Sequence, residues 1–186
     1  MHHLLRWIIP SLLSAAVSLA SAQPASAPRP LQSIASLDLA RYGGTWYEIA
    51  KYPNWFQRQC ASDTRAEYSA RQDGQVRVLN RCRRQDGSSI EADGVARQVG
   101  GAQSSRLQVR FAPDWLAFIP ALWADYWVID LDPGYQLAAV SEPGREYLWI
   151  LARQPQPPAA ELQALLQRLG ALGFDLNRLE STRQSP

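Results

Sequence analysis

Between Gly43 and Arg153 the chain alternates short apolar or alternating segments with turn residues. The hydrophobic pattern predicts eight strands, which are Thr45–Tyr52, Asp63–Ala70, Gln75–Arg83, Ser89–Val99, Ser105–Phe111, Tyr126–Leu131, Tyr135–Ser141 and Glu146–Arg153. Asp73-Gly74 and Asp86-Gly87 are strong hairpin signals. Because eight strands joined in order can close on themselves and leave no free edge, the pattern predicts an all-β, eight-stranded antiparallel up-and-down barrel.

One later segment has a helical period instead. Leu162, Leu165, Leu166, Leu169 and Leu172 recur at helical spacing, after a Pro-Pro pair and before a glycine. These start and stop signals predict a C-terminal α-helix over residues 159–172. Its apolar stripe needs a surface to cover, so we expect it to pack on the outside of the barrel. Trp149, on the opposite face of the last strand from its apolar neighbours, is a candidate for that outer wall.

The N-terminus has the pattern of an export signal. A short basic segment precedes an apolar run at residues 7–20, and Ala20-Ser21-Ala22 offers a small-residue cleavage site. The run is shorter than the roughly 20 residues that span a bilayer, which favours a signal peptide over a membrane anchor. We therefore predict a signal peptide at 1–22, a flexible leader at 23–33 and one folded domain at 34–182.

Composition limits the chemistry of the mature chain. Removal of Arg6 with the signal leaves 18 of the 19 Lys and Arg residues against 17 Asp and Glu, a near balance that does not favour nucleic-acid binding. The two histidines, His2 and His3, both lie in the predicted signal peptide. Without an imidazole for nucleophilic catalysis or metal binding, we predict no enzyme, no metal site and no cofactor.

Cys60 and Cys82 are the two cysteines of the chain. In an exported protein an isolated pair favours a disulfide over a redox or metal site. The hairpin at Asp73-Gly74 brings the two positions side by side. Such a bond closes a loop of about 22 residues and contributes on the order of 3 kcal/mol to stability.

Three short motifs resemble the lipocalin family. Asp38-x-x-x-Tyr42-x-Gly44-x-Trp46 resembles its first signature, a short helix followed by the first strand. Residues 130–135 fall where the second signature lies, and Arg153 resembles the third. The resemblance covers roughly residues 36 to 179. Within the family it is greatest to the bacterial outer-membrane lipocalin and apolipoprotein D branch.

The resemblance implies structural roles for Gly44, Trp46 and Arg153. Trp46 would plug the narrow end of the barrel, and Arg153 would lie across its indole ring. Such a cation–π contact contributes on the order of 1 kcal/mol. We therefore do not count these residues as ligand contacts.

An eight-stranded barrel of this type holds one small ligand, and its wall here is mostly apolar. Strand parity predicts the ligand-binding residues, which are Ala50, Tyr52, Tyr68, Val78, Asn80, Ala96, Leu107, Val109, Phe111 and Trp127, with Ala66, Gly94 and Ile129 as further lining positions. For each residue, ordinary filling of the barrel is the alternative. Glu48 shares the parity of Trp46, and two roles stay open for it: contact with a ligand head group or a salt bridge to an inward arginine.

With Trp46 at the closed end, the loops after strands one, three, five and seven surround the mouth. Two of these loops are apolar, and their candidate residues for a membrane or mouth contact are Trp55, Phe56, Trp115, Leu116, Phe118, Ile119, Leu122 and Trp123. A lid folded over the cavity, a contact with a lipid surface and a homodimer interface are three readings of this pattern.

The resemblance implies a non-enzymatic carrier of a fatty acid, a lysophospholipid or a similar apolar molecule. We expect it in the periplasm or at the outer membrane. Bacterial relatives often carry an acylated cysteine, and none follows the predicted cleavage site, so we expect no lipid anchor. The alternatives are an enzyme that acts on lipids through cavity Asp, Glu, Tyr or Arg residues, and an interaction protein of the cell envelope.

Overall fold

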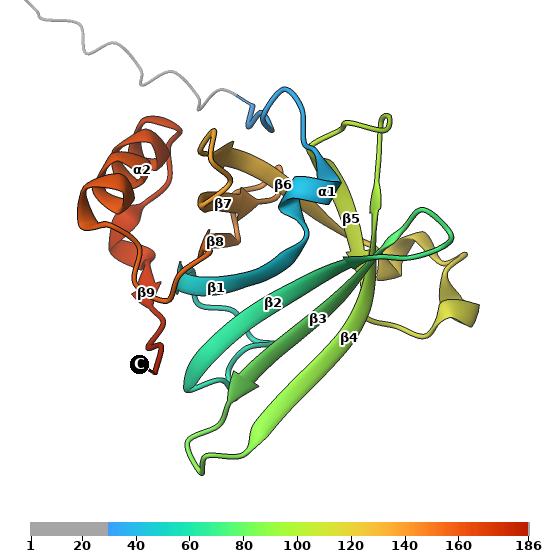
Figure 1. Ribbon diagram of the computed structural model, residues 1–186, viewed down its shortest axis with the longest axis horizontal. Coiled ribbons are helices and arrows are strands. Elements are labelled where there is room, and N and C mark those ends of the chain that lie inside the picture. Colours follow the sequence, from blue (N-terminus) through green and yellow to red (C-terminus); the bar gives the residue numbers. More distant parts are fainter. Residues whose placement is uncertain (1–29, 186) are drawn as a thin grey trace, which may run out of the picture.

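Residues 30–185 are described by the computed structural model, and their strands form one antiparallel sheet that closes into a barrel (Figure 1). The strands are β1 (Gly44–Lys51), β2 (Ser62–Ala70), β3 (Val76–Arg83), β4 (Ser89–Gln98), β5 (Arg106–Arg110), β6 (Ala124–Leu131), β7 (Leu137–Ser141), β8 (Leu148–Ala152) and β9 (Glu180–Ser181). The helices are α1 (Leu39–Tyr42) and α2 (Ala159–Ala171), with 3-10 helices η1 (Asp114–Leu116), η2 (Pro120–Leu122) and η3 (Leu176–Arg178). The predicted eight-stranded barrel with an outer C-terminal helix is confirmed.

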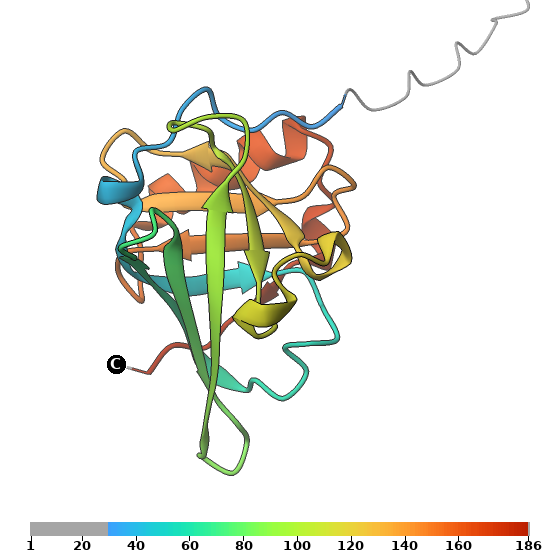
Figure 2. The ribbon, with the colours of Figure 1, turned by 90° about the vertical axis from the view of Figure 1, so that its right-hand side faces the viewer.

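The barrel closes because β1 pairs with both ends of the sheet. Its first half pairs with β2, from Gly44 opposite Tyr68 to Tyr47 opposite Arg65. Its second half pairs with β8, with a bulge between Glu48 and Ala50. In Figure 2, β4 and β5 run across the direction of β1, β7 and β8, as in two crossed layers.

A short ninth strand completes the wall where β1 and β2 separate. β9 pairs with the end of β1, placing Ala50 opposite Ser181 and Lys51 opposite Glu180. The following residue, Thr182, donates its backbone N–H to the carbonyl of Ile49 at 2.9 Å. The tail thereby occupies a sheet edge that would otherwise be unpaired. The sequence pattern did not predict β9, because two residues carry no periodicity.

Two hydrophobic clusters lie on the two sides of the barrel wall. The interior cluster contains Leu37, Tyr42, Trp46, Ala66, Tyr68, Val76, Val78, Ala96, Leu107, Val128, Ala138, Val140 and Leu151. The outer cluster contains Leu31, Ala50, Tyr52, Ile129, Leu137, Ala139, Leu148, Ile150, Ala152, Leu165, Leu169 and Phe174. Strands β7 and β8 contribute to both clusters, so their residues are apolar without alternation.

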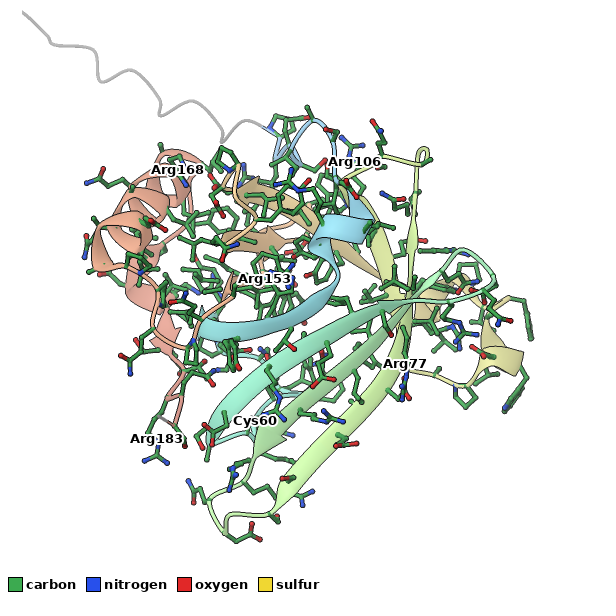
Figure 3. All side chains as sticks on the ribbon, viewed as in Figure 1. Cys60, Arg77, Arg106, Arg153, Arg168 and Arg183 are labelled. Carbon is green, nitrogen blue, oxygen red and sulfur yellow. A yellow bond between two sulfur atoms is a disulfide. The ribbon has the colours of Figure 1, made fainter. Side chains whose placement is uncertain are left out.

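Helix α2 covers the outer cluster, as Figure 1 shows on one side of the barrel. Leu165 and Leu169 are its buried residues. Arg168 fixes the helix to β6, since its Nε and Nη2 donate to the Asp130 carboxylate at 2.7 and 2.9 Å (Figure 3). The prediction that Trp149 forms the outer wall is wrong: Leu148 and Ile150 face the helix, and Trp149 packs on the interior cluster.

The segment before α1 is packed against the barrel. Leu31 is buried in the outer cluster, and the Ile34 backbone N–H donates to the carbonyl of Val128 at 2.9 Å. Packing therefore begins within the leader predicted at 23–33. The predicted signal peptide and residues 23–29 lie outside the described residues. Within residues 30–185, no helix combines the length and hydropathy that a membrane span requires.

The predicted disulfide is confirmed. Cys60 and Cys82 are bonded, 22 residues apart in the sequence, with their Cα atoms 5.5 Å apart. Cys82 is buried near the end of β3, and Cys60 lies just before β2. The bond therefore ties the loop after β1 to the β2–β3 hairpin.

Replacement of both cysteines by serine is expected to lower the free energy of unfolding by about 3 kcal/mol, because the closed loop constrains the unfolded chain. Urea unfolding followed by tryptophan fluorescence measures this difference. Oxidised wild type is the control, and wild type reduced with dithiothreitol should match the variant. An unchanged unfolding midpoint in both cases would contradict the prediction.

Candidate functional site

The closed end of the barrel is built around Trp46, which is fully buried. Its indole N–H donates to the carbonyl of Tyr42 at 2.8 Å. The Arg153 guanidinium lies 4.0 Å from the centre of its ring. The same guanidinium donates to three backbone carbonyls, those of Thr45 and Arg41 at 2.8 Å and Tyr135 at 3.2 Å. It thus joins β1, α1 and the β6–β7 turn at one point.

Gly44 is required at this junction for two reasons. Its φ is +88°, in the region that favours glycine. A Cβ at this position would also lie 3.3 Å from an Arg153 guanidinium nitrogen. The glycine therefore allows the arginine to approach the first strand.

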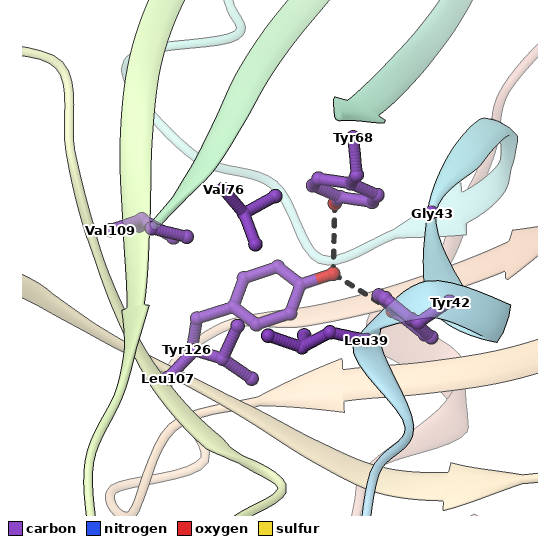
Figure 4. A pocket seen from close by; sticks show the side chains of 9 residues that line it. Leu39, Tyr42, Gly43, Tyr68, Val76, Leu107, Val109 and Tyr126 are labelled. Atoms are coloured by element: carbon purple, nitrogen blue, oxygen red, sulfur yellow. Dashed lines mark hydrogen bonds between the residues drawn. The ribbon is translucent and has the colours of Figure 1, made fainter. Parts of the chain in front are cut away.

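Three tyrosines meet inside the barrel next to this closed end (Figure 4). The Tyr126 hydroxyl lies 2.9 Å from both the Tyr42 and the Tyr68 hydroxyls. Burial raises the pKa of Tyr68 to about 12 and that of Tyr42 and Tyr126 well above the usual value. All three phenols are therefore neutral donors at physiological pH.

A small cavity lies against the three hydroxyl groups. Its volume is about 10 Å³, room for about one water molecule. It is lined by Leu39, Tyr42, Gly43, Tyr68, Val76, Ala96, Leu107, Val109 and Tyr126. Of the predicted ligand contacts, Tyr68, Ala96, Leu107 and Val109 are brought together here. Since the cavity is small, a larger ligand requires interior side chains to move.

Other predicted lining residues share this interior without touching the cavity. Val78 and Ala66 belong to the interior cluster. Asn80 lies opposite Ala66 in the β2–β3 ladder, so it occupies the same face. Whether any of these residues contacts a ligand stays a prediction.

Ala50 and Tyr52 do not face the interior, which corrects the parity predicted for the first strand. The bulge between Glu48 and Ala50 adds one residue and turns the rest of the strand over. Both side chains pack in the outer cluster, and the Tyr52 hydroxyl donates to the carbonyl of Asp175 at 3.0 Å. The single residue inserted by a bulge leaves no reliable sign in the hydrophobic pattern.

The interior placement predicted for Trp127 and Ile129 is also wrong. Both pack against the outer cluster, whereas Tyr126 and Val128 face inward. Every residue of Tyr126–Ile129 is apolar or aromatic, so the pattern did not reveal the facing. Sequence reasoning therefore missed Tyr126, the centre of the tyrosine group.

Phe111 lies one residue beyond β5 and remains 46% exposed. Its ring covers Gly94, where an added Cβ would lie 2.6 Å from a ring carbon. Gly94 is thus needed for close approach of the ring. Phe111 therefore lies against β4 at the rim of the barrel rather than deep inside it.

Glu48 faces the interior and is 2% exposed. Its two oxygens accept from the Thr182 hydroxyl at 2.5 Å and from the Gln57 amide nitrogen at 2.6 Å. The Gln57 amide oxygen in turn accepts from the Trp149 indole N–H at 3.0 Å. Burial raises the pKa of the Glu48 carboxyl, and the two hydrogen bonds and Lys51 oppose that change. Glu48 thus joins the loop after β1 to the tail.

The loop after β1 presents an aromatic surface. Trp55 is 69% exposed and contacts Phe56 at 5.6 Å between ring centres. Phe56 contacts Tyr147 at 5.7 Å, and Tyr147 stacks on Trp149 at 5.8 Å. The aromatic rings therefore run continuously from the solvent to the interior cluster.

The loop after β5 folds against the outer face of the barrel. Arg110 is buried there. Its Nη2 lies 2.6 Å from the Asp114 Oδ1, and its Nη1 donates hydrogen bonds to the carbonyls of Ala112 and Pro113. The Trp123 ring packs on Arg97 and Arg110, with 4.0 and 5.1 Å to the guanidinium carbons. Because Trp123 is only 9% exposed, it is not available for the membrane contact predicted for this loop.

The remaining apolar residues of this loop stay accessible to different degrees. Trp115 and Phe118 are 73% and 77% exposed, and Leu122 is also exposed. Leu116 and Ile119 are half-buried. The outward packing of Arg110 and Trp123 argues against a lid folded over the cavity. Among the described residues no group of three or more His, Cys, Asp or Glu side chains is arranged to hold a metal ion.

Comparison with known proteins adds a family context. The family model described as "Lipocalin-like domain" matches residues 37–184. Temperature-induced lipocalin-1 of Arabidopsis thaliana is 36% identical over 162 residues, covering 83% of each chain. Outer membrane lipoprotein Blc of Escherichia coli K12 is 35% identical over 152 residues, covering 81% of each chain. Apolipoprotein D of Macaca fascicularis is 31% identical, covering 80% of this chain and 78% of its own.

Solved structures show the same fold at lower identity. The cockroach allergen Per a 4 superposes with a TM-score of 0.63 at 18% identity, covering 83% of this chain and 94% of that one. Insecticyanin of the tobacco hornworm Manduca sexta gives a TM-score of 0.62 at 18% identity, covering 83% and 85%. At this identity the comparison concerns the fold alone.

Replacement of Glu48 by Gln tests the buried carboxyl. A carboxyl whose pKa is raised by folding stabilises the folded chain fully below its unfolded value, and this contribution is lost as the pH rises through the folded value. Relative to Glu48→Gln, wild type should therefore lose stability as the pH rises from below the ordinary carboxyl pKa of 4.5 through the raised value of the folded state. Urea unfolding at each pH measures the difference. The exposed Glu161→Gln is the control, and a constant difference between wild type and Glu48→Gln would contradict the prediction.

Proposed function

This chain belongs to the lipocalin family, and on that premise we propose that it is an exported carrier of a fatty acid, a lysophospholipid or a similar apolar molecule. Lipocalins bind small hydrophobic ligands. The observation that carries the proposal is the interior cluster, whose wall is aliphatic and aromatic above a floor closed by Trp46 and Arg153. An apolar wall with few polar groups suits an acyl chain.

The interior chemistry supports a carrier rather than an enzyme. Lipocalins are ligand-binding carriers, not enzymes. In this chain the buried Glu48 carboxylate already accepts hydrogen bonds at both oxygens. Burial raises the pKa of the three interior phenols further above its usual value, so they stay protonated. Neither group is placed as a free base, so we assign no catalytic residue.

For location, we propose the periplasm or the outer-membrane surface. The Escherichia coli and Vibrio cholerae relatives are named outer membrane lipoproteins. The sequence holds two cysteines, and they are bonded to each other. Neither Cys60 nor Cys82 is therefore free to be acylated.

We also propose that the exposed aromatic residues of the two mouth loops contact a membrane surface. Trp55, Trp115 and Phe118 are the most exposed large apolar residues of the described chain. Arg58 is exposed beside Trp55, and Arg84 binds Gln59 of the same loop at 3.2 Å. Aromatic rings with basic neighbours suit the interface of an anionic bilayer.

Native mass spectrometry of the protein purified from its own cell envelope tests the carrier. We expect one acyl lipid per chain, released on denaturation, and displacement of a fluorescent fatty acid by that lipid. Protein that is consistently empty and does not bind the fluorescent fatty acid would rule out the proposed function. Denatured protein, prepared from the same sample, controls for lipid that adheres nonspecifically.

Trp55→Ser and Trp115→Ser test the membrane contact. Each substitution is expected to weaken binding to vesicles of phosphatidylglycerol and phosphatidylethanolamine by about fivefold, because an interfacial ring is lost. Vesicle co-sedimentation measures the binding. Val99→Ser, at an exposed apolar site in the β4–β5 turn, is the matched control. Unchanged vesicle binding, together with a change from dimer to monomer, would assign these residues to a homodimer interface instead.

A further inference from the structure

Among the three interior tyrosines, one hydroxyl donor has no acceptor within the group. Tyr42, Tyr68 and Tyr126 carry one O–H donor each, and two hydroxyl contacts join them. Each contact uses one proton, whichever oxygen donates it. One O–H donor is therefore left over, and within residues 30–185 these three hydroxyl groups make no other hydrogen bond.

The three tyrosines line the small cavity, so the remaining donor lies at its wall. Apart from the tyrosines and Gly43, the residues that line it are aliphatic: Leu39, Val76, Ala96, Leu107 and Val109. Figure 4 shows the Tyr126 hydroxyl at the centre of this group, with those of Tyr42 and Tyr68 on either side. The cavity volume, about 10 Å³, fits about one oxygen-sized group. A buried donor without a partner is costly, so this position favours an acceptor.

We propose that the tyrosine group is a ligand subsite that binds a neutral oxygen acceptor, a carbonyl or a hydroxyl, at the buried end of an apolar ligand. This inference rests on the proposed carrier function and narrows its ligand class. The rest of the ligand lies against the interior cluster, toward the mouth. The subsite therefore selects apolar molecules that enter with an oxygen first.

A carboxylate fits this subsite less well than a neutral oxygen. The burial that raises the pKa of the three phenols also penalises a carboxylate placed beside them. The charge of Arg153 acts on Tyr42 and Tyr68, and its guanidinium is held on the Trp46 ring by three backbone carbonyls. An ionised fatty acid therefore binds with its head group at the mouth.

Two ligands of equal length test the subsite: 2-dodecanone, which has a carbonyl acceptor, and 1-dodecene, which has none. Displacement of a fluorescent fatty acid from the full chain measures both affinities. The ratio of the ketone affinity to the alkene affinity is expected to fall about fivefold when Tyr42, Tyr68 and Tyr126 are all replaced by Phe, because one neutral hydrogen bond is lost. Removal of all three hydroxyl groups leaves no unpaired partner in the core.

Two single variants sharpen the test. Tyr42→Phe leaves two hydroxyl groups and one contact, so one donor remains and the ketone preference should persist. Tyr47→Phe is the matched control, since Tyr47 lies on the outer face of β1 and its hydroxyl makes no hydrogen bond within the described residues. An unchanged ratio in the triple variant would overturn the subsite while leaving the carrier function intact. Failure of both ligands and the fatty acid to bind wild type would overturn both.

Infrared spectroscopy of bound, isotopically labelled 2-dodecanone gives a readout on wild type alone, in case the triple variant does not fold. The carbonyl stretch should lie at lower wavenumber than that of the same ketone in dodecane, because the phenol donates to it. A stretch at the dodecane position would overturn the subsite. A shift that persists in a folded triple variant would assign the donor to another group and would overturn it as well.

Discussion

The barrel depends on one arginine at its closed end. Arg153 directly follows β8. Its guanidinium lies on the Trp46 ring and donates to carbonyls of α1, β1 and the β6–β7 turn. These carbonyls lie at the floor of the barrel, where the wall ends. A single planar, permanently charged group satisfies three of them and packs on an apolar ring at once. The floor is thereby sealed without a further element.

The second constraint is the bulge in β1. Ahead of it, Trp46 and Glu48 face the interior, and after it Ala50 faces α2. Beyond Tyr47, β1 no longer pairs with β2, and β9 and Thr182 pair with this end of β1. The inserted residue therefore determines which side chains of the second half of β1 join the outer surface that α2 covers.

Two separate sets of polar side chains lie inside the apolar wall. The tyrosine group lies next to the floor, and Glu48, Gln57 and Trp149 form a hydrogen-bonded chain that reaches the first mouth loop. The exposed ring of Trp55 belongs to that same loop, two residues before Gln57. The loop that carries Trp55 is therefore hydrogen-bonded, through Gln57, to the buried Glu48 carboxylate.

The sequence by itself determined the barrel, the outer helix, the disulfide pair and the family signatures. These features follow from local signals: alternation, turn residues, leucine spacing and short motifs. Ala66, Tyr68, Val78 and Ala96 were also placed inside correctly, since β2, β3 and β4 keep their parity along the interior-facing residues. Ala50, Tyr52 and Trp127 were placed on the wrong face, because a bulge or an all-apolar strand hides which face is buried.

Only the tertiary structure decided the remaining features. The tyrosine group joins residues from α1, β2 and β6, and its hydrogen bonds exist only when those elements meet. Trp123 is buried because Arg97 and Arg110 present their guanidinium groups to it from neighbouring strands. The Glu48 carboxylate accepts hydrogen bonds from Thr182, far along the chain, and from Gln57. Such contacts depend on distances in space, which no local pattern of residues encodes.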